Sequence, residues 1–294
     1  MTAQRVFRFG VNMVVPKSRG EWVEKCRRAE ELGFDVIGVA DHLGMPAPFP
    51  ALILGAEATE RVRLNTFVLN TPFYNPVLLA REVATADQFT DGRIELGLGA
   101  GYVKTEFEAA GIPFESGGRR VARVEETIAT LKGLLADPDH RPQPVQRPTP
   151  PLLVAGWGDR LLSVAAEHAD IVAFTGAATG ADGALQLADA DGMSERVAFA
   201  RGKLGPRADE VEFNLLIQRV VPHDELAAFT ADFAPLLPPD LRDHADKLPI
   251  LLVGGPEEIA DRVRDLRARY GFTYITVLET SMETFAPAIS LLRD

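Results

Sequence analysis

The chain of 294 residues has a single cysteine, no long apolar run and no run of basic residues. With Cys26 alone, an internal disulfide and a cysteine-based metal site are both excluded. No uninterrupted apolar stretch approaches the roughly 20 residues that a membrane-spanning helix needs, so no segment is expected to cross a membrane. The first 12 residues lack the apolar core of a signal peptide, and we therefore expect a cytoplasmic protein.

The charge of the chain also argues against one class of partner. The formal net charge is -11 and the sequence pI is near 5.0. No cluster of Lys and Arg is long enough to follow a phosphate backbone, so we expect no nucleic-acid partner. Hydrophobic residues make up 46% and charged residues 25%, which is ordinary for a globular protein, and the length allows two small domains or one large barrel.

Short apolar segments alternate with amphipathic ones along the whole chain. Residues 34–40 (FDVIGVA) are a continuous apolar run, typical of a strand buried on both faces. About eight strand–helix units in this length predict an α/β fold, a (β/α)8 TIM barrel forming a single domain over residues 1–294. A doubly wound Rossmann fold is the alternative. The predicted strands are 6–11, 34–40, 62–69, 94–98, 152–155, 171–174, 212–221, 250–253 and 274–278.

In such a barrel the chemistry lies after the strand ends, and Asp41 and His42 follow the second strand. A carboxylate beside an imidazole is an acid–base or hydrogen-bonding unit. The alternative is that Asp41 caps the next helix while His42 lies on the surface. The four other histidines form neither His-x-His nor His-Glu-x-x-His, so we expect no metal, although a barrel can gather ligands from distant strand ends.

Glycine-rich loops follow the fourth and fifth predicted strands. Residues 97–101 (GLGAG) resemble the start of the dinucleotide fingerprint GxGxxG. The last glycine of that pattern would stand at position 102, where this chain has Tyr102. Their glycines indicate a backbone that approaches a ligand or needs positive φ. Residues 156–158 (GWG) come just before a helix, whose bare N-terminal amides favour a phosphate. Tight turns alone would explain either loop, whereas two loops on adjacent strands favour an anionic ligand.

Taken together, these segments resemble the bacterial luciferase-like oxidoreductase family over most of the chain. The resemblance implies a (β/α)8 barrel that binds either reduced FMN or the deazaflavin coenzyme F420. An Asp-His pair after the second strand is similar to the F420-dependent branch, whereas FMN monooxygenases more often carry Glu-His-His there. The matching segments are 33–42 (GFDVIGVADH), 61–64 (RVRL), 75–76 (NP), 80–81 (AR), 91–99 (DGRIELGLG), 151–156 (PLLVAG), 165–166 (AA), 169–170 (AD) and 253–258 (VGGPEE).

The resemblance also implies roles for particular residues. His42 would meet the reacting face of the ring as a catalytic acid–base group, and Asp41 would lie at the ring edge. Phe67 and Val68 would be joined by a non-proline cis peptide bond behind the ring. The phosphate tail would be held by the strand-end loops after strands four, five and six, with these candidate residues: Ala100, Gly101, Gly156, Trp157, Gly158, Phe174 and Thr175.

The function implied is hydride transfer between C5 of F420 (an 8-hydroxy-5-deazaflavin) and a small uncharged molecule such as an enone, imine or secondary alcohol. Sugar-phosphate dehydrogenases of the family carry a glutamate where this chain has Tyr102, and residues 175–203 hold no basic cluster, so an anionic substrate is not expected. The alternatives are an FMN-dependent monooxygenase and a non-catalytic flavin-binding protein that would be indifferent to changes at Asp41 and His42. Dimers are common in such families, and a homodimer is expected by analogy alone.

Overall fold

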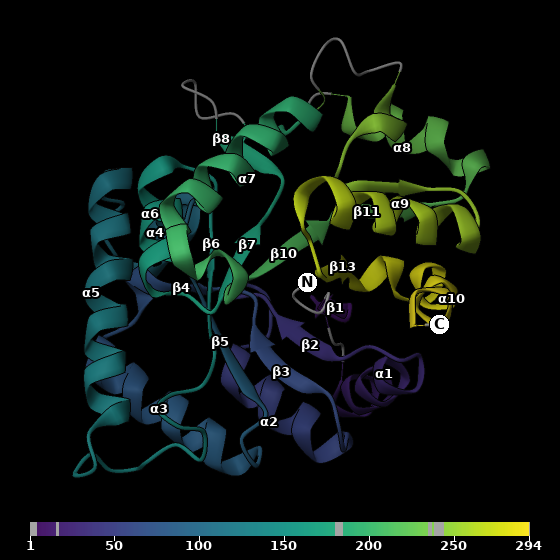
Figure 1. Cartoon of the computed structure of the whole chain (residues 1–294). Helices are drawn as coiled ribbons and strands as arrows, with labels where there is room; N and C mark the ends of the chain where they lie inside the picture. Colours follow the sequence, from purple (N-terminus) through teal and green to yellow (C-terminus); the bar gives the residue numbers. More distant parts are fainter. Residues whose placement is uncertain (1–4, 16–17, 180–184, 235–236, 238–243, 294) are drawn as a thin grey trace.

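The computed structural model describes residues 5–15, 18–179, 185–234, 237 and 244–293. Eight parallel strands form a closed barrel, because each strand pairs with the next and the last pairs with the first (Figure 1). An open Rossmann sheet would leave two unpaired edges, so the predicted TIM barrel is confirmed. The wall strands are β1 (Arg8–Met13), β2 (Val36–Val39), β3 (Arg63–Thr66), β5 (Ile94–Gly99), β6 (Leu152–Ala155), β7 (Ile171–Phe174), β10 (Glu212–Ile217) and β13 (Tyr274–Leu278).

Helices connect the wall strands and lie outside the barrel (Figure 1). Among the helices of the described ranges, none is long and apolar enough to span a membrane. The connecting helices are α1 (Arg19–Glu31), α2 (Pro48–Ala58), α3 (Pro76–Phe89), α5 (Gly117–Ala136), α6 (Asp159–His168), α7 (Ala190–Leu204), α9 (Pro256–Tyr270) and α10 (Met282–Arg293). Shorter elements are α4 (Lys104–Ala110), α8 (Leu226–Phe233) and the 3-10 turns η1 (Thr71–Phe73), η2 (Gly205–Asp209), η3 (His223–Glu225), η5 (Ala245–Lys247) and η6 (Glu279–Ser281).

The predicted strand 250–253 does not belong to the barrel wall. The predicted strand 212–221 is divided at Gln218 into β10 and β11 (Arg219–Val221), and β12 (Leu251–Val253) pairs with β11 in parallel. Apolar content alone could not separate β12 from a wall strand, because both are short buried runs. A hairpin of β8 (Ala177–Thr179) and β9 (Leu185–Leu187) and the two-residue strand β4 (Leu69–Asn70) complete the strands.

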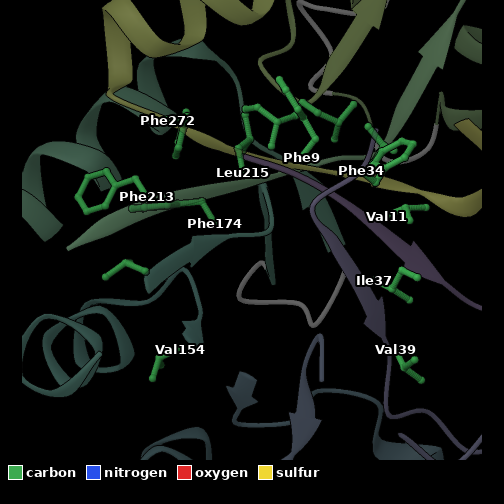
Figure 2. Close-up of a cluster of buried hydrophobic side chains, with 14 of the residues drawn as sticks. Phe9, Val11, Phe34, Ile37, Val39, Val154, Phe174, Phe213, Leu215 and Phe272 are labelled. Atoms are coloured by element: carbon green, nitrogen blue, oxygen red, sulfur yellow. The ribbon is translucent and has the colours of Figure 1, made fainter. Parts of the chain in front are cut away.

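The core has two layers, because successive side chains of each strand face the barrel interior and the helices in turn. The outer layer is rich in aromatic and branched residues, and Figure 2 shows part of it, including Phe9 and Val11 of β1 and Ile37 and Val39 of β2. Since both faces of the wall strands are buried, β2, β6 and β7 appear in the sequence as unbroken apolar runs. The inner layer contains Val36, Phe67, Leu153, Ala155, Ile171, Ala173, Leu216 and Tyr274.

Charged side chains close the N-terminal end of the barrel. Arg8, at the start of β1, forms ion pairs with Glu95 of β5 and with Glu212 of β10, the latter at 2.7 Å. Arg63 of β3 also reaches Glu95, at 2.6 Å. The Arg8 guanidinium lies 4.7 Å from the ring centre of Tyr274. These contacts fill the N-terminal end, and in barrels of this kind ligand sites lie at the opposite, C-terminal end.

Candidate active site

Asp41 lies just beyond β2, at the C-terminal end of the barrel. Its Oδ2 accepts a hydrogen bond of 2.9 Å from the backbone N–H of Asn70, and the Tyr74 hydroxyl is also bonded to the carboxyl group. Burial raises the pKa of Asp41 above its ordinary value, although these hydrogen bonds and the neighbouring His42 oppose the shift. Asp41 is therefore bound to the segment after β3 rather than capping a helix.

His42 pairs with a carboxylate that the sequence analysis did not identify. Its Nδ1 lies 2.9 Å from Oε1 of Glu106 in α4, and the two side chains are 29% and 14% exposed. The ring of Tyr102 stands edge-on to the imidazole, with ring centres 5.9 Å apart. His42 is thus held in place on two sides at the barrel mouth and is not a free surface residue.

The predicted cis peptide bond between Phe67 and Val68 is present. It lies between β3 and β4, where the chain bulges toward the neighbouring strand β5. A Cβ at Gly99 would lie 2.6 Å from Cγ2 of Val68, and a Cβ at Gly97 would overlap the carbonyl oxygen of Thr66. Gly97 and Gly99 therefore allow β5 to pack closely against β3 and the bulge that follows it.

Gly101, in contrast, needs glycine for its own backbone. Its φ is +69°, and a Cβ there would overlap Oδ1 of Asn70. That Oδ1 is one of the buried side-chain atoms for which the described residues provide no hydrogen-bond partner. A buried acceptor of this kind is costly unless a donor reaches it. Gly101 and the half-buried Ala100 thus stand beside an acceptor that a ligand N–H or O–H could satisfy.

The loop after β6 presents the start of α6 to the same end of the barrel. Gly158 is the residue before α6 and provides no side-chain cap, so the first amides of the helix stay open to an anion. Gly156 and Trp157 before it are half-buried. Arg160 donates to the carbonyl of Gly118 at 2.7 Å, which ties α6 to the start of α5.

A second arginine connects the start of α5 to the loop after β5. Arg120 Nε donates to the carbonyl oxygen of Gly101 at 3.1 Å. The two glycine loops predicted to hold a phosphate are therefore brought together, and they are braced by guanidinium groups. Open amides with positive charge nearby are the chemistry that a phosphate group requires.

The two residues predicted after the sixth strand have different positions. Phe174 is fully buried, and its ring packs against Phe213 and Phe272 on the helix side of the wall, with ring centres 5.5 Å apart in each case (Figure 2). Its side chain is therefore unavailable to a ligand at the mouth. The carbonyl of Thr175 accepts a hydrogen bond of 3.2 Å from Nε2 of Gln218, a half-buried residue at the end of β10 that sequence analysis missed.

One group of potential metal ligands occurs among the described residues, and it is remote from His42. It consists of Glu125, Glu167 and His168, whose ligand atoms lie within 4.8 Å of one another on α5 and α6. Both carboxylates are exposed, and His168 is at the opposite end of α6 from Gly158. The candidate active site is thus built without these residues.

The arrangement of the chain agrees with one family of proteins. Residues 6–274 match the model of the family described as luciferase-like monooxygenases. The chain belongs to this family. The cis bond at Phe67 and Val68 and the Asp41–His42 pair thus occur in a luciferase-like barrel.

Relatives of two kinds match parts of the chain. It is 32% identical over 155 residues to the oxygenase component of the flavin-dependent trigonelline monooxygenase of Acinetobacter baylyi, covering 46% of this chain and 42% of the relative. It is 38% identical over 125 residues to the F420-dependent glucose-6-phosphate dehydrogenase of Intrasporangium calvum, covering 39% and 37%. The matched segments therefore span less than half the length of these relatives.

A solved structure extends the likeness to the whole barrel. The F420-dependent tetrahydromethanopterin reductase of Methanopyrus kandleri superposes with a TM-score of 0.77 and covers 99% of this chain and 98% of the reductase. At 17% sequence identity this likeness concerns the fold alone. Luciferase-like relatives thus include both F420-dependent and flavin-dependent oxidoreductases, and the cofactor of this chain must be argued from its own residues.

Proposed function

We propose that this protein is an F420-dependent oxidoreductase that transfers a hydride between C5 of the deazaflavin and a small uncharged organic molecule. The observation that carries the proposal is the His42 imidazole, fixed at the barrel mouth by Glu106 in the loop after β2, the strand that pairs with β3 and so lies beside the Phe67–Val68 bulge. Similarity to F420-dependent glucose-6-phosphate dehydrogenases adds support. When bound, a 5-deazaflavin supplies two-electron hydride chemistry and does not activate oxygen.

The residues at the mouth fit such a group by their chemistry. The apolar bulge of Phe67 and Val68 would support a flat ring system, and the unpaired Oδ1 of Asn70 would accept from a ring N–H. The open amides after Gly158 would hold a phosphate, with the braced loop at Gly101 beside them. Reduced FMN has a ring system of similar shape and also carries a phosphate, so these contacts alone do not separate the two cofactors. The Asp41–His42 pair, which resembles that of the F420-dependent branch, is the feature that favours F420.

His42 would manage the proton that accompanies the hydride. Oxidation of a secondary alcohol removes a hydride from carbon and a proton from oxygen, and reduction of a carbonyl group supplies both. With Nδ1 occupied by Glu106, His42 presents Nε2 to take or return that proton. A general acid or base of this kind typically contributes about 10²- to 10⁴-fold to the rate.

The side chains around His42 favour an uncharged substrate. Leu43 and Tyr102 are 51% and 60% exposed, which is high for large hydrophobic side chains, and they flank His42 in sequence or in space. Two carboxylates, those of Asp41 and Glu106, also adjoin His42. A phosphorylated sugar would be repelled by these carboxylates, whereas a ketone, imine or alcohol would not.

The cofactor can be tested directly on the purified apoprotein. Anaerobic titrations with F420 and with reduced FMN, followed by fluorescence, should give at least tenfold tighter binding of F420. Tight binding of reduced FMN alone would instead favour the second candidate, an FMN-dependent monooxygenase, which is supported by the similarity to the trigonelline monooxygenase. Matched titrations of Gly133→Ala, a change on α5 with open space around the new Cβ, control for nonspecific effects.

A further inference from the structure

The partner of His42 is contributed by a distant part of the chain. His42 follows β2, and Glu106 lies 64 residues later in α4, yet Oε1 and Nδ1 are 2.9 Å apart. No hydrogen bond joins His42 to its neighbour Asp41 among the described residues, because that carboxyl group is engaged by the Asn70 N–H and the Tyr74 hydroxyl. Of the two carboxylates near the imidazole, Glu106 is the one that contacts it.

The chemistry of this contact determines where the imidazole carries its proton. A neutral imidazole has one N–H, and an ionised carboxylate can only accept a hydrogen bond. Nδ1 must therefore be the protonated nitrogen opposite Glu106, which leaves Nε2 as the acceptor. When Nε2 takes a proton, the carboxylate also stabilises the imidazolium that forms.

The helix that carries Glu106 is held firmly. Phe107, the next residue, is fully buried, and its ring lies 5.0 Å from the ring centres of both Phe73 and Phe114. The N–H of Glu106 donates to the carbonyl of Val103 at 3.0 Å in the first turn of α4. The carboxylate is thus presented from a packed helix and not from a loose side chain on the surface.

We infer that Glu106 is the positioning residue of the active site, fixing His42 in the Nδ1–H form so that Nε2 faces the reacting group. This role rests on the proposed function, since it matters for turnover only if His42 moves a proton. It assigns the orienting task to α4 after the fourth wall strand, and it makes Asp41 part of the framework around His42 instead of its acid–base partner.

NMR spectroscopy of the His42 imidazole tests this role directly. Protein labelled with 15N-histidine gives long-range 1H–15N correlations that distinguish the two neutral forms, and His42→Asn assigns the signal among the five histidines. The wild type should show His42 as the Nδ1–H form. Glu106→Gln replaces an acceptor-only group with an amide that can also donate, so the signal should change to a mixture of both forms.

Steady-state kinetics and the conservative variant Glu106→Asp test the positioning role further. In Glu106→Gln, kcat should fall about 10- to 100-fold, the range seen when orienting partners are removed, with KM changed less than about threefold. Glu106→Asp keeps an acceptor-only carboxylate and should restore part of both the signal and kcat. The matched control is Glu258→Gln, which breaks the exposed His223–Glu258 pair and should alter only the His223 signal.

The outcomes separate the two proposals. An unchanged Nδ1–H signal for His42 in folded Glu106→Gln would overturn the positioning role, as would an unchanged kcat in that variant. If the wild type does not turn over with F420 while the His42 signal still depends on Glu106, the proposed function fails and the control of the imidazole by Glu106 stands. Equal losses in Glu106→Asp and Glu106→Gln would also contradict the requirement for a carboxylate.

Discussion

The two ends of the barrel use charge in opposite ways. At the N-terminal end, Arg8 is placed between Glu95 and Glu212, so opposite charges meet one another inside the protein. At the C-terminal end, Nδ1 of His42 pairs with Glu106 while no described residue bonds its Nε2, and the start of α6 at Gly158 has no side-chain cap. One end uses its polar groups to close the barrel, and the other leaves them available to a ligand, which is how one scaffold separates stability from chemistry.

The largest effect should come from breaking the closed end. Arg8→Ala leaves Glu212 buried without its ion-pair partner and Glu95 with Arg63 alone, so the free energy of unfolding should fall by about 3–5 kcal/mol. Urea denaturation measures this loss. Arg28→Ala, which removes an exposed pair with Glu283, is the control and should cost less than about 1 kcal/mol. A similar small loss for both variants would show that the closed end is not held by its charges.

At the open end, His42→Ala should affect turnover without affecting the fold. The side chain is 29% exposed, so its removal should change the free energy of unfolding by less than about 1 kcal/mol. Turnover should fall about 10²-fold, equivalent to about 2.7 kcal/mol in the barrier, with F420 affinity within a few-fold. Steady-state kinetics and the cofactor titration measure both. Near-wild-type turnover would remove His42 from the mechanism.

Gly101→Ala should combine a structural and a binding effect. The φ of +69° disfavours alanine, and the new Cβ would overlap Oδ1 of Asn70. We expect about 1–2 kcal/mol lower stability and about tenfold weaker F420 binding, because the displaced loop lies beside the ligand end of the barrel. Gly133→Ala provides the control, since its Cβ meets nothing within 4 Å and alanine favours a helix. Unchanged affinity in Gly101→Ala would exclude this loop from the cofactor site.

The difference between the two ends also explains what sequence analysis could find. Strand order, the barrel and the cis bond after Phe67 follow from local patterns or from a resemblance carried by local segments, and the structure confirms them. Asp41 and His42 were found because they come directly after a buried strand. The ion pairs of Arg8 were not, since strands far apart in sequence meet there only after the barrel closes.

The missed site residues have specific physical reasons. Glu106 lies on a helix of 7 residues, too short to show a clear period, with only Phe107 buried. The only feature in the sequence that could have marked Glu106 is a carboxylate soon after the end of β5. Because β3 lies between β2 and β5 in the wall, the two strand ends are not neighbours, and the sequence gives no reason to pair Glu106 with His42. Gln218 was hidden inside one continuous predicted strand. Phe174 ends the predicted strand, but its side chain faces the helices.

The smallest expected effect concerns the carboxylates of the closed end. Burial raises the pKa of Glu212 above its ordinary value of 4.5, and the attraction of Arg8 only partly opposes this. The folded protein therefore binds this proton more tightly than the unfolded chain does. The resulting stability is complete below the ordinary value and is lost as the pH rises through the raised one.

Glu212→Gln should accordingly match the wild type near pH 4 and become slightly more stable than it toward pH 7. One proton at most is involved, so the difference should grow by no more than about 1.4 kcal/mol per pH unit. Urea denaturation at several pH values measures it. If the wild type instead becomes more stable than the variant as the pH rises, the attraction between Glu212 and Arg8 outweighs the effect of burial on Glu212. If Glu212→Gln is slightly stabilising as expected, Arg8→Ala lowers the free energy of unfolding far more than neutralising one of its partners does. Arg8 is then the residue that holds this end of the barrel closed.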